Sequence, residues 1–186
     1  SNTGAVANNI TIDASSSVTI ESGSSLIING TATVNGDFIY KVQVNDDKWH
    51  LVASPVAGEQ YNDTWNTANG IAINLPNEAV STYINTSDAD GDWVYYQHNV
   101  SGSITFAPGI GYSLKNASGA GGDYSFTGTF PVPPINPTIT ASNLMNANAN
   151  RWNLVGNPYA SAINLNNDAS ATNNFLRVKI TKNYKN

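Results

Sequence analysis

The stretch KWHLVASPVA, residues 48–57, returns in nearly the same form as RWNLVGNPYA at residues 151–160. Trp, Leu, Val and Pro recur at identical spacing, and a cation precedes the tryptophan in both copies. Because the chain holds only four tryptophans, this agreement indicates an internal duplication. In each copy Trp and Leu alternate along an expected strand that ends at the proline. We therefore predict that Trp49 and Trp152 are core or inter-unit packing residues of a β-sandwich; the alternative is that they contact a ligand.

Residues 45–186 consist of apolar and aromatic stretches separated by turn residues at short, regular intervals. No window places apolar residues at helical spacing over three turns, so we expect little helix. The pattern predicts an all-β fold, an antiparallel β-sandwich or jelly-roll-like domain. The second copy of the repeat indicates a second unit that starts near residue 144 and is incomplete. The proline-rich stretch PVPPINP, residues 131–137, is expected to link the two units.

Residues 1–44 show a different pattern, in which very short stretches of alternating β-branched residues are separated by turns such as Asn-Gly. Alternation with period two predicts strands, and the Gly and Asn residues supply the corners. Repeats this short resemble the coils of a parallel β-solenoid, and we predict a solenoid-like or capping segment here. The alternative is a set of hairpins belonging to an ordinary sandwich.

The composition is polar but weakly charged, with 11% charged residues and 28 asparagines. Such a surface is typical of extracellular β-proteins, so we expect a secreted or cell-surface location. Eight scattered Lys and Arg residues and a net charge of −5 argue against nucleic acid as a partner. The absence of cysteine excludes disulfides, zinc ribbons and iron–sulfur sites. No apolar run reaches the length of a membrane span, so membrane insertion is not expected.

Six stretches in order, KWHLVASPV, AVSTYI, DWVYY, FAPGIGYSLK, GGDYSFTGTF and RWNLVGNPYASAI, together resemble a β-rich repeat domain of secreted and surface proteins of the Bacteroidota. The resemblance covers about residues 40–165, and WNLVGNPYAS is its most specific part. Arg151 and Ala160 stand where that family usually has Gly and Pro. The resemblance implies export by the type IX secretion system, in a polypeptide with other domains. It also implies that the domain accompanies glycan-degrading enzymes and adhesins. It does not imply a particular reaction for the domain itself.

Catalytic residues are not evident, and we expect that the chain is not an enzyme. His50 and His98 have no carboxylate or second histidine at metal-ligand spacing, so each is expected to be an ordinary strand residue. Ser54 lacks the Gly-x-Ser-x-Gly setting of a hydrolase nucleophile. Glu59 and Asp63 are the remaining candidates for a glycosidase pair, but they lie in a turn-like stretch without signs of a cleft.

The acidic stretch SDADGDW, residues 87–93, is a possible calcium site and the only cofactor site that we expect. Asp88, Asp90 and Asp92 alternate, as oxygen ligands do in calcium loops. The stretch does not follow the EF-hand pattern, because Gly and the bidentate Glu are not at the required positions. The alternative is an acidic hairpin tip that turns at Asp-Gly.

Aromatic residues give the best candidates for ligand binding. In the expected strand DWVYYQH, one face should enter the core and the other should expose a ring or two beside polar groups, as sugar-binding modules do. Trp65 lies in the polar stretch YNDTWNTANG, which looks least like a strand, so we predict that it is exposed. The alternative is that Trp65 closes the end of the sandwich. The candidate glycan-binding residues are Trp65, Tyr61, Asn62, Trp93, Tyr95 and Tyr96.

These observations predict a non-catalytic accessory module that binds a polysaccharide or a cell-surface glycan, or that acts in adhesion. The alternative is a purely structural spacer or stalk domain in a large exported protein. Exposed aromatic rings with saturable binding would favour the first function, whereas the absence of any ligand response would favour the second.

Overall fold

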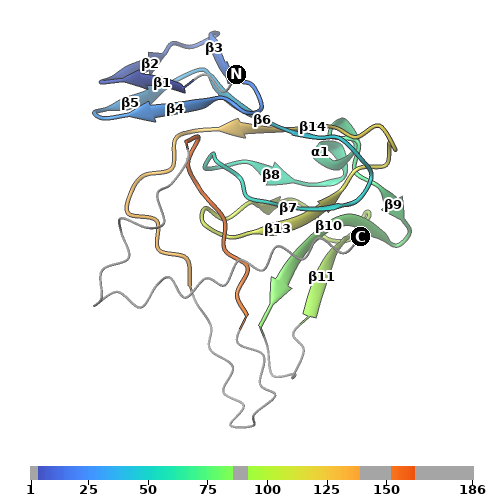
Figure 1. Cartoon of the computed structure of the whole chain (residues 1–186). Helices are drawn as coiled ribbons and strands as arrows, with labels where there is room; N and C mark the ends of the chain where they lie inside the picture. Colours follow the sequence, from blue (N-terminus) through green and yellow to red (C-terminus); the bar gives the residue numbers. More distant parts are fainter. Residues whose placement is uncertain (1–3, 86–91, 139–151, 162–186) are drawn as a thin grey trace, which may run out of the picture.

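The structure is a computed structural model that describes residues 4–85, 92–138 and 152–161. Within these ranges the chain is almost entirely β, and the only helix is α1 (Asp63–Ala68). The predicted all-β fold is therefore confirmed. Figure 1 shows the first strands gathered at one end of the molecule and the later strands forming the layers beside them.

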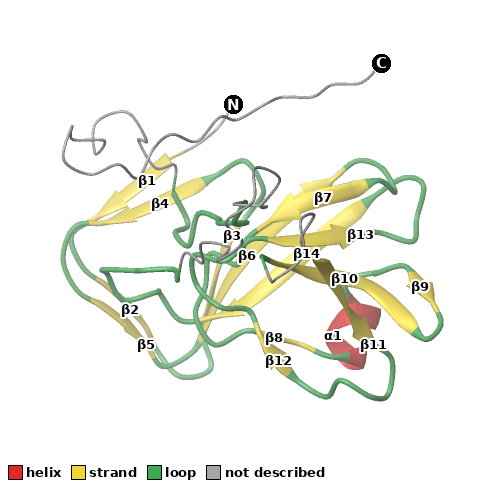
Figure 2. Cartoon of the chain, turned by 90° about the horizontal axis from the view of Figure 1, so that it is seen from below, coloured by secondary structure: helices red, strands yellow, loops and turns green. Residues whose placement is uncertain are grey.

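The first six strands form two coils of a parallel solenoid. Each strand of the first coil pairs in parallel with the strand three places later: β1 with β4, β2 with β5 and β3 with β6. Figure 2 shows these pairs as the three sides of the coil. Their bounds are β1 (Gly4–Ala7), β2 (Ile10–Ile12), β3 (Ser17–Ile20), β4 (Ser25–Ile28), β5 (Ala32–Val34) and β6 (Asp37–Val44). The predicted solenoid-like segment is thus present, and the hairpin alternative is wrong.

Strand β6 joins the solenoid to the sandwich. On one side it pairs in parallel with β3, and on the other it pairs with β14 (Gly122–Gly128) in an antiparallel ladder from Phe38–Gly128 to Val44–Gly122. Phe38 is completely buried, and its ring centroid lies 4.0 Å from that of Phe130. Residues 1–44 and 45–186 are therefore joined by a strand pairing, since β6 of the first segment pairs with β14 of the second.

A second, antiparallel sheet faces β14 and β6, and Figures 1 and 2 show its strands side by side. Its order is β11–β10–β13–β7, with the short β9 paired to β10. The small β8–β12 pair lies next to α1, as Figure 2 shows. The bounds are β7 (Trp49–Val52), β8 (Gln60–Tyr61), β9 (Ile73–Asn74), β10 (Asn77–Ile84), β11 (Asp92–Gln97), β12 (Ile104–Thr105) and β13 (Tyr112–Lys115).

The core between the layers is rich in aromatic rings. Phe106 is completely buried, and its ring centroid lies within 5.2 Å of those of Tyr61, Trp65, Tyr112 and Phe126. Val80 and Leu114 enter the same core from β10 and β13, the two central strands of the antiparallel sheet. Tyr112, the first residue of β13, is also buried in this core.

The two copies of the repeated motif lie next to each other. Residues 152–161 run beside the loop before β13, with a bridge between Val155 and Ile110 and a hydrogen bond from Gly111 N to Leu154 O of 3.0 Å. A side chain at Gly156 would come within 2.2 Å of the Cβ of Ala53, so only glycine permits this approach of the second copy to the first. The remainder of the predicted second unit lies outside the described residues.

The prediction that the repeated tryptophans are core residues is wrong. Trp49 is 46% exposed and Trp152 is 64% exposed. In β7 the residues alternate as predicted, but Trp49 and Leu51 point outward while His50 and Val52 point toward the core side. Period-two alternation defines two faces of a strand without saying which one is buried, and here the more apolar pair lies outside.

Candidate functional site

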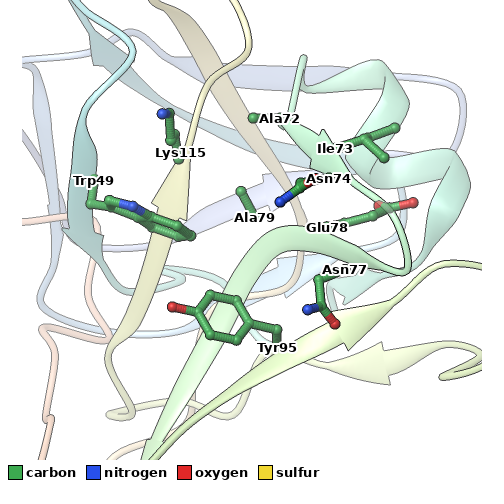
Figure 3. A pocket seen from close by; sticks show the side chains of 9 residues that line it. All are labelled: Trp49, Ala72, Ile73, Asn74, Asn77, Glu78, Ala79, Tyr95 and Lys115. Carbon is green, nitrogen blue, oxygen red and sulfur yellow. The ribbon is translucent and has the colours of Figure 1, made fainter.

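A pocket of about 400 Å³ opens on the outer side of the antiparallel sheet. Its walls come from every strand of that sheet: Trp49 from β7, Lys115 from β13, Tyr95 from β11, and residues of β10 and β9. Figure 3 shows the pocket with Trp49 and Tyr95 on one side and the asparagine side chains on the other. The lining residues are Trp49, Ala72, Ile73, Asn74, Asn77, Glu78, Ala79, Tyr95 and Lys115.

The two aromatic walls approach each other across the sheet. Trp49 and Tyr95 stand on the two edge strands, yet their ring centroids are only 5.8 Å apart at an interplanar angle of 62°. The central strands carry small residues between them: Ser81 lies opposite Tyr95, and Ser113 lies opposite Ser81, so there is room for the large rings above the sheet. The rings remain 46% and 38% exposed, which leaves apolar surface available to a ligand.

Polar groups complete the pocket. The amides of Asn74 and Asn77 supply both hydrogen-bond donors and acceptors, and Lys115 supplies a positive charge. Among the described residues, no carboxylate forms an ion pair with Lys115. Glu78 contributes only its stem, because its carboxylate points away from Trp49 and Tyr95 (Figure 3). The pocket therefore combines flat apolar rings, neutral amides and one cation.

The Glu78 carboxylate belongs to a second group of residues, on the inner side of the sheet. Glu78 is 1% exposed, and its Oε1 lies 2.5 Å from Nδ1 of His98. The same imidazole nitrogen lies 3.4 Å from Oδ1 of Asp63, in the first turn of α1. The other oxygen of Glu78 accepts a hydrogen bond from the side-chain amide of Asn66. We call Asp63, Asn66, Glu78 and His98 the α1 cluster.

The chain positions the α1 cluster through local capping and turn geometry. The side chain of Asn62 accepts a hydrogen bond from Trp65 N and begins α1, which fixes Asp63 in the first turn. His98 directly follows β11, and its backbone N donates to Pro76 O at 2.9 Å. Asn99 adopts a left-handed conformation (φ 56°), and its N–H donates to Asp63 Oδ2 at 3.2 Å.

Electrostatics in the α1 cluster follow from these contacts. The hydrogen bond to Glu78 raises the pKa of His98, and the negative charge of Asp63 adds to this effect. Burial raises the pKa of Tyr96, and its hydrogen bond to Asp63 raises it further. The imidazole is therefore held between two carboxylates. Local sequence spacing missed this group because Glu78 and His98 are 20 residues apart.

The structure separates the predicted glycan-binding residues into two sets. Trp65, Tyr61 and Tyr96 are buried in the core, with exposures of 8%, 5% and 3%, and Asn62 caps α1. The prediction that Trp65 is exposed is therefore wrong: it lies in a short helix in which Thr64 and Thr67 are exposed while the indole points inward. Tyr95 lines the pocket, and Trp93 is 41% exposed with its ring 5.3 Å from that of Tyr83.

The possible calcium site falls mostly outside the described residues. Asp88 and Asp90 lie there, while Asp92 is the exposed first residue of β11. Four residues that line the pocket are not among the predicted glycan-binding residues: Trp49, Asn74, Asn77 and Lys115. The repeated motif drew attention to Trp49 but predicted that its side chain faces the core. No local pattern distinguishes the other three residues from the many polar residues of this chain.

Within the described part of the chain, no helix combines the length and the apolar character needed to cross a membrane.

Comparisons with known proteins give one result. The comparison with the curated proteins found no match, and neither did the comparison with the solved structures. A family model matches residues 1–183, almost the whole chain, and the chain therefore belongs to the family described as "Domain of unknown function (DUF8693)".

Proposed function

We propose that this chain is a non-catalytic, glycan-binding module of a secreted or cell-surface bacterial protein, and that the pocket at Trp49 and Tyr95 holds the sugar. The observation that carries the proposal is the pair of half-exposed rings over a pocket of about 400 Å³ that is also lined by Asn74 and Asn77. Pockets of about 300–1,000 Å³ with apolar walls and a few polar groups are typical of small-ligand sites.

The chemistry of the pocket matches that of a sugar. A pyranose ring has an apolar face of C–H groups, which packs on an aromatic ring, and a rim of hydroxyl groups, which need both donors and acceptors. The side chains of Asn74 and Asn77 offer both kinds of group. An anionic oligosaccharide is the preferred class, because Lys115 adds a positive charge to the wall.

The secreted location rests on composition and resemblance. A weakly charged chain without cysteine, rich in asparagine and built only from β-strands and one short helix in its described part, is what we expect of an exported bacterial module. The resemblance to repeat domains of type IX-exported Bacteroidota proteins supports the same location. Those proteins include polysaccharide-degrading enzymes and adhesins, for which a glycan-binding module is a suitable companion.

The carboxylates that could serve a glycosidase are occupied by backbone groups. Glu59 accepts hydrogen bonds from the backbone N–H groups of Gln60 and Thr127, and burial raises its pKa. Asp63 accepts the N–H of Asn99 and faces His98. Neither residue lines the pocket at Trp49. These contacts support a binding role for the pocket.

Replacement of Trp49 by alanine tests the proposal. The chain is first screened against neutral and anionic polysaccharides by affinity electrophoresis, and the best ligand is then titrated calorimetrically. Trp49→Ala should weaken binding by about 30-fold or more, the loss expected when an aromatic contact worth about 2 kcal/mol is removed. Trp152→Ala is the matched control, since Trp152 is also exposed but lies outside the pocket, and it should change the affinity by less than about twofold. Equal binding by wild type and Trp49→Ala would refute this site.

The structural spacer remains the second candidate, favoured by a specific feature. The shared strand β6 fixes the solenoid to the sandwich through hydrogen bonds on both of its edges. Such a joint resists bending, as a domain that holds others away from a surface must. A spacer predicts that no polysaccharide of the screen binds to the wild-type chain.

A further inference from the structure

The α1 cluster holds a set of side chains that can bind a metal ion. Asp63, Glu78 and His98 each offer one ligand atom, and these atoms all lie within 4.8 Å of one another. They come from three separate places in the fold: the first turn of α1, strand β10 and the residue after β11. Glu78 is buried, whereas the side chains of Asp63 and His98 are 33% and 32% exposed, so the group is open to solvent on one side.

Asn66 provides an independent sign of a missing partner. Asn66 is 1% exposed, and its side-chain amide contacts the Glu78 carboxylate through Nδ2. Its Oδ1 atom is buried and has no hydrogen-bond partner among the described residues. Buried polar atoms are almost always satisfied, and an amide can exchange the places of its oxygen and nitrogen by a half turn. After that turn Oδ1 would face a carboxylate oxygen, an arrangement that a cation between the two oxygens stabilises.

We propose that Asp63, Glu78, His98 and Asn66 bind a divalent transition metal ion, with zinc as the representative ion. One imidazole nitrogen and three oxygens make a four-coordinate set of the kind that zinc accepts. The imidazole distinguishes this site from a calcium or magnesium site, because those ions prefer ligand shells made of oxygen. The site and the glycan-binding pocket share Glu78, whose carboxylate belongs to the site and whose stem lines the pocket.

The geometry needs only a small adjustment to admit the ion. Zinc–ligand distances of about 2.0–2.2 Å at tetrahedral angles separate neighbouring ligand atoms by about 3.3–3.5 Å. The distance from His98 Nδ1 to Asp63 Oδ1 is already 3.4 Å, whereas the distance to Glu78 Oε1 is 2.5 Å and must widen. The half-exposed imidazole of His98 can make this movement.

Neighbouring residues already orient the Asp63 carboxylate, one of the proposed metal ligands. Its carboxylate accepts the N–H of Asn99 and the hydroxyl of Tyr96. Hydrogen bonds of this kind hold metal ligands in place in known sites, and their loss usually weakens metal binding 10–100-fold. The bound ion would connect α1 to β10 and to the residue after β11, which already meet here through the contacts of His98 with Asp63 and Glu78.

The test is a calorimetric titration of the chelator-treated full chain with zinc at mildly alkaline pH. We expect one saturable site, and His98→Asn should weaken zinc binding by at least about 10–100-fold, because the loss of a direct ligand should cost at least as much as the loss of a hydrogen bond to a ligand. His50→Asn is the matched control: His50 also pairs with a carboxylate, with Nε2 2.8 Å from Asp46 Oδ1, but lies outside the α1 cluster. His50→Asn should leave the affinity unchanged.

A second measurement keeps the test independent of the variants. In the wild-type chain, zinc should shift the imidazole NMR signals of His98 and leave those of His50 in place, since the chain contains only these two histidines. Calcium should move neither set. The proposal is overturned if zinc shows no saturable binding, if His98→Asn binds zinc as the wild type does, or if the signals of His98 do not respond.

Discussion

Trp65→Ala is expected to lower the free energy of unfolding by about 3–5 kcal/mol, the usual cost of removing a large buried aromatic side chain. Trp65 is 8% exposed, its ring centroid lies 5.0 Å from that of Phe106, and its Nε1–H donates to Ser125 O at 3.1 Å. Alanine would leave a cavity beside Phe106 and an unpaired carbonyl at Ser125. Denaturant unfolding followed by circular dichroism measures the change.

Trp93→Ala is the control for this prediction. Trp93 is 41% exposed, and its loss should cost no more than about 1 kcal/mol. The two variants also test the prediction of glycan binding, because Trp65 and Trp93 are both candidate glycan-binding residues. If Trp65→Ala kept its stability and lost polysaccharide binding, the ring would have to be at a binding surface, and the core described above would be wrong.

Phe38→Ala is expected to have an effect of similar size, about 3–5 kcal/mol, and to act on both parts of the molecule. Phe38 is completely buried in β6, the strand that pairs with β3 of the solenoid and with β14 of the sandwich. Because one strand supplies hydrogen bonds to both, weakening it should weaken both together. Native-state hydrogen exchange should show protection falling in β3 and in β14 by similar free energies.

Ile27→Ala provides the comparison for Phe38→Ala. Ile27 is 45% exposed on β4, away from the shared strand, and its replacement should change stability by less than about 1 kcal/mol. Loss of protection in β3 with full protection in β14 would contradict the prediction for Phe38. The solenoid would then unfold as a separate unit.

The sequence alone determined the class of the fold and the place where its pattern changes. Short β-branched alternations such as Ile10–Ile12 and Ala32–Val34, with Gly and Asn at the corners, are compatible with tight coils, and they do pair in parallel. The length of a coil was less evident, because the strand spacing of the sequence does not say how many strands complete one turn. One coil uses three strands, as the register between β1 and β4 shows.

The glycan candidates show the limit of reasoning from local pattern. On β11 the predicted split into two faces is confirmed in part: Tyr96 is buried while Trp93 and Tyr95 are exposed, but Val94, on the same face as Tyr96, is 48% exposed. On β7 the same reasoning chose the wrong face for Trp49. A strand's alternation is symmetric, and the choice between its faces depends on which layer the rest of the chain places against it.

Only the tertiary structure decided which polar residues meet. Glu78 and His98 come together because β10 and β11 pair with a fixed register, and Asp63 joins them because α1 packs against the inner side of that sheet. The pocket likewise forms because Trp49 and Tyr95 stand on opposite edges of a sheet whose central strands carry small residues. Local sequence fixes backbone preferences over a few residues, whereas a site is assembled by long-range pairing, and its members are defined by which strands become neighbours.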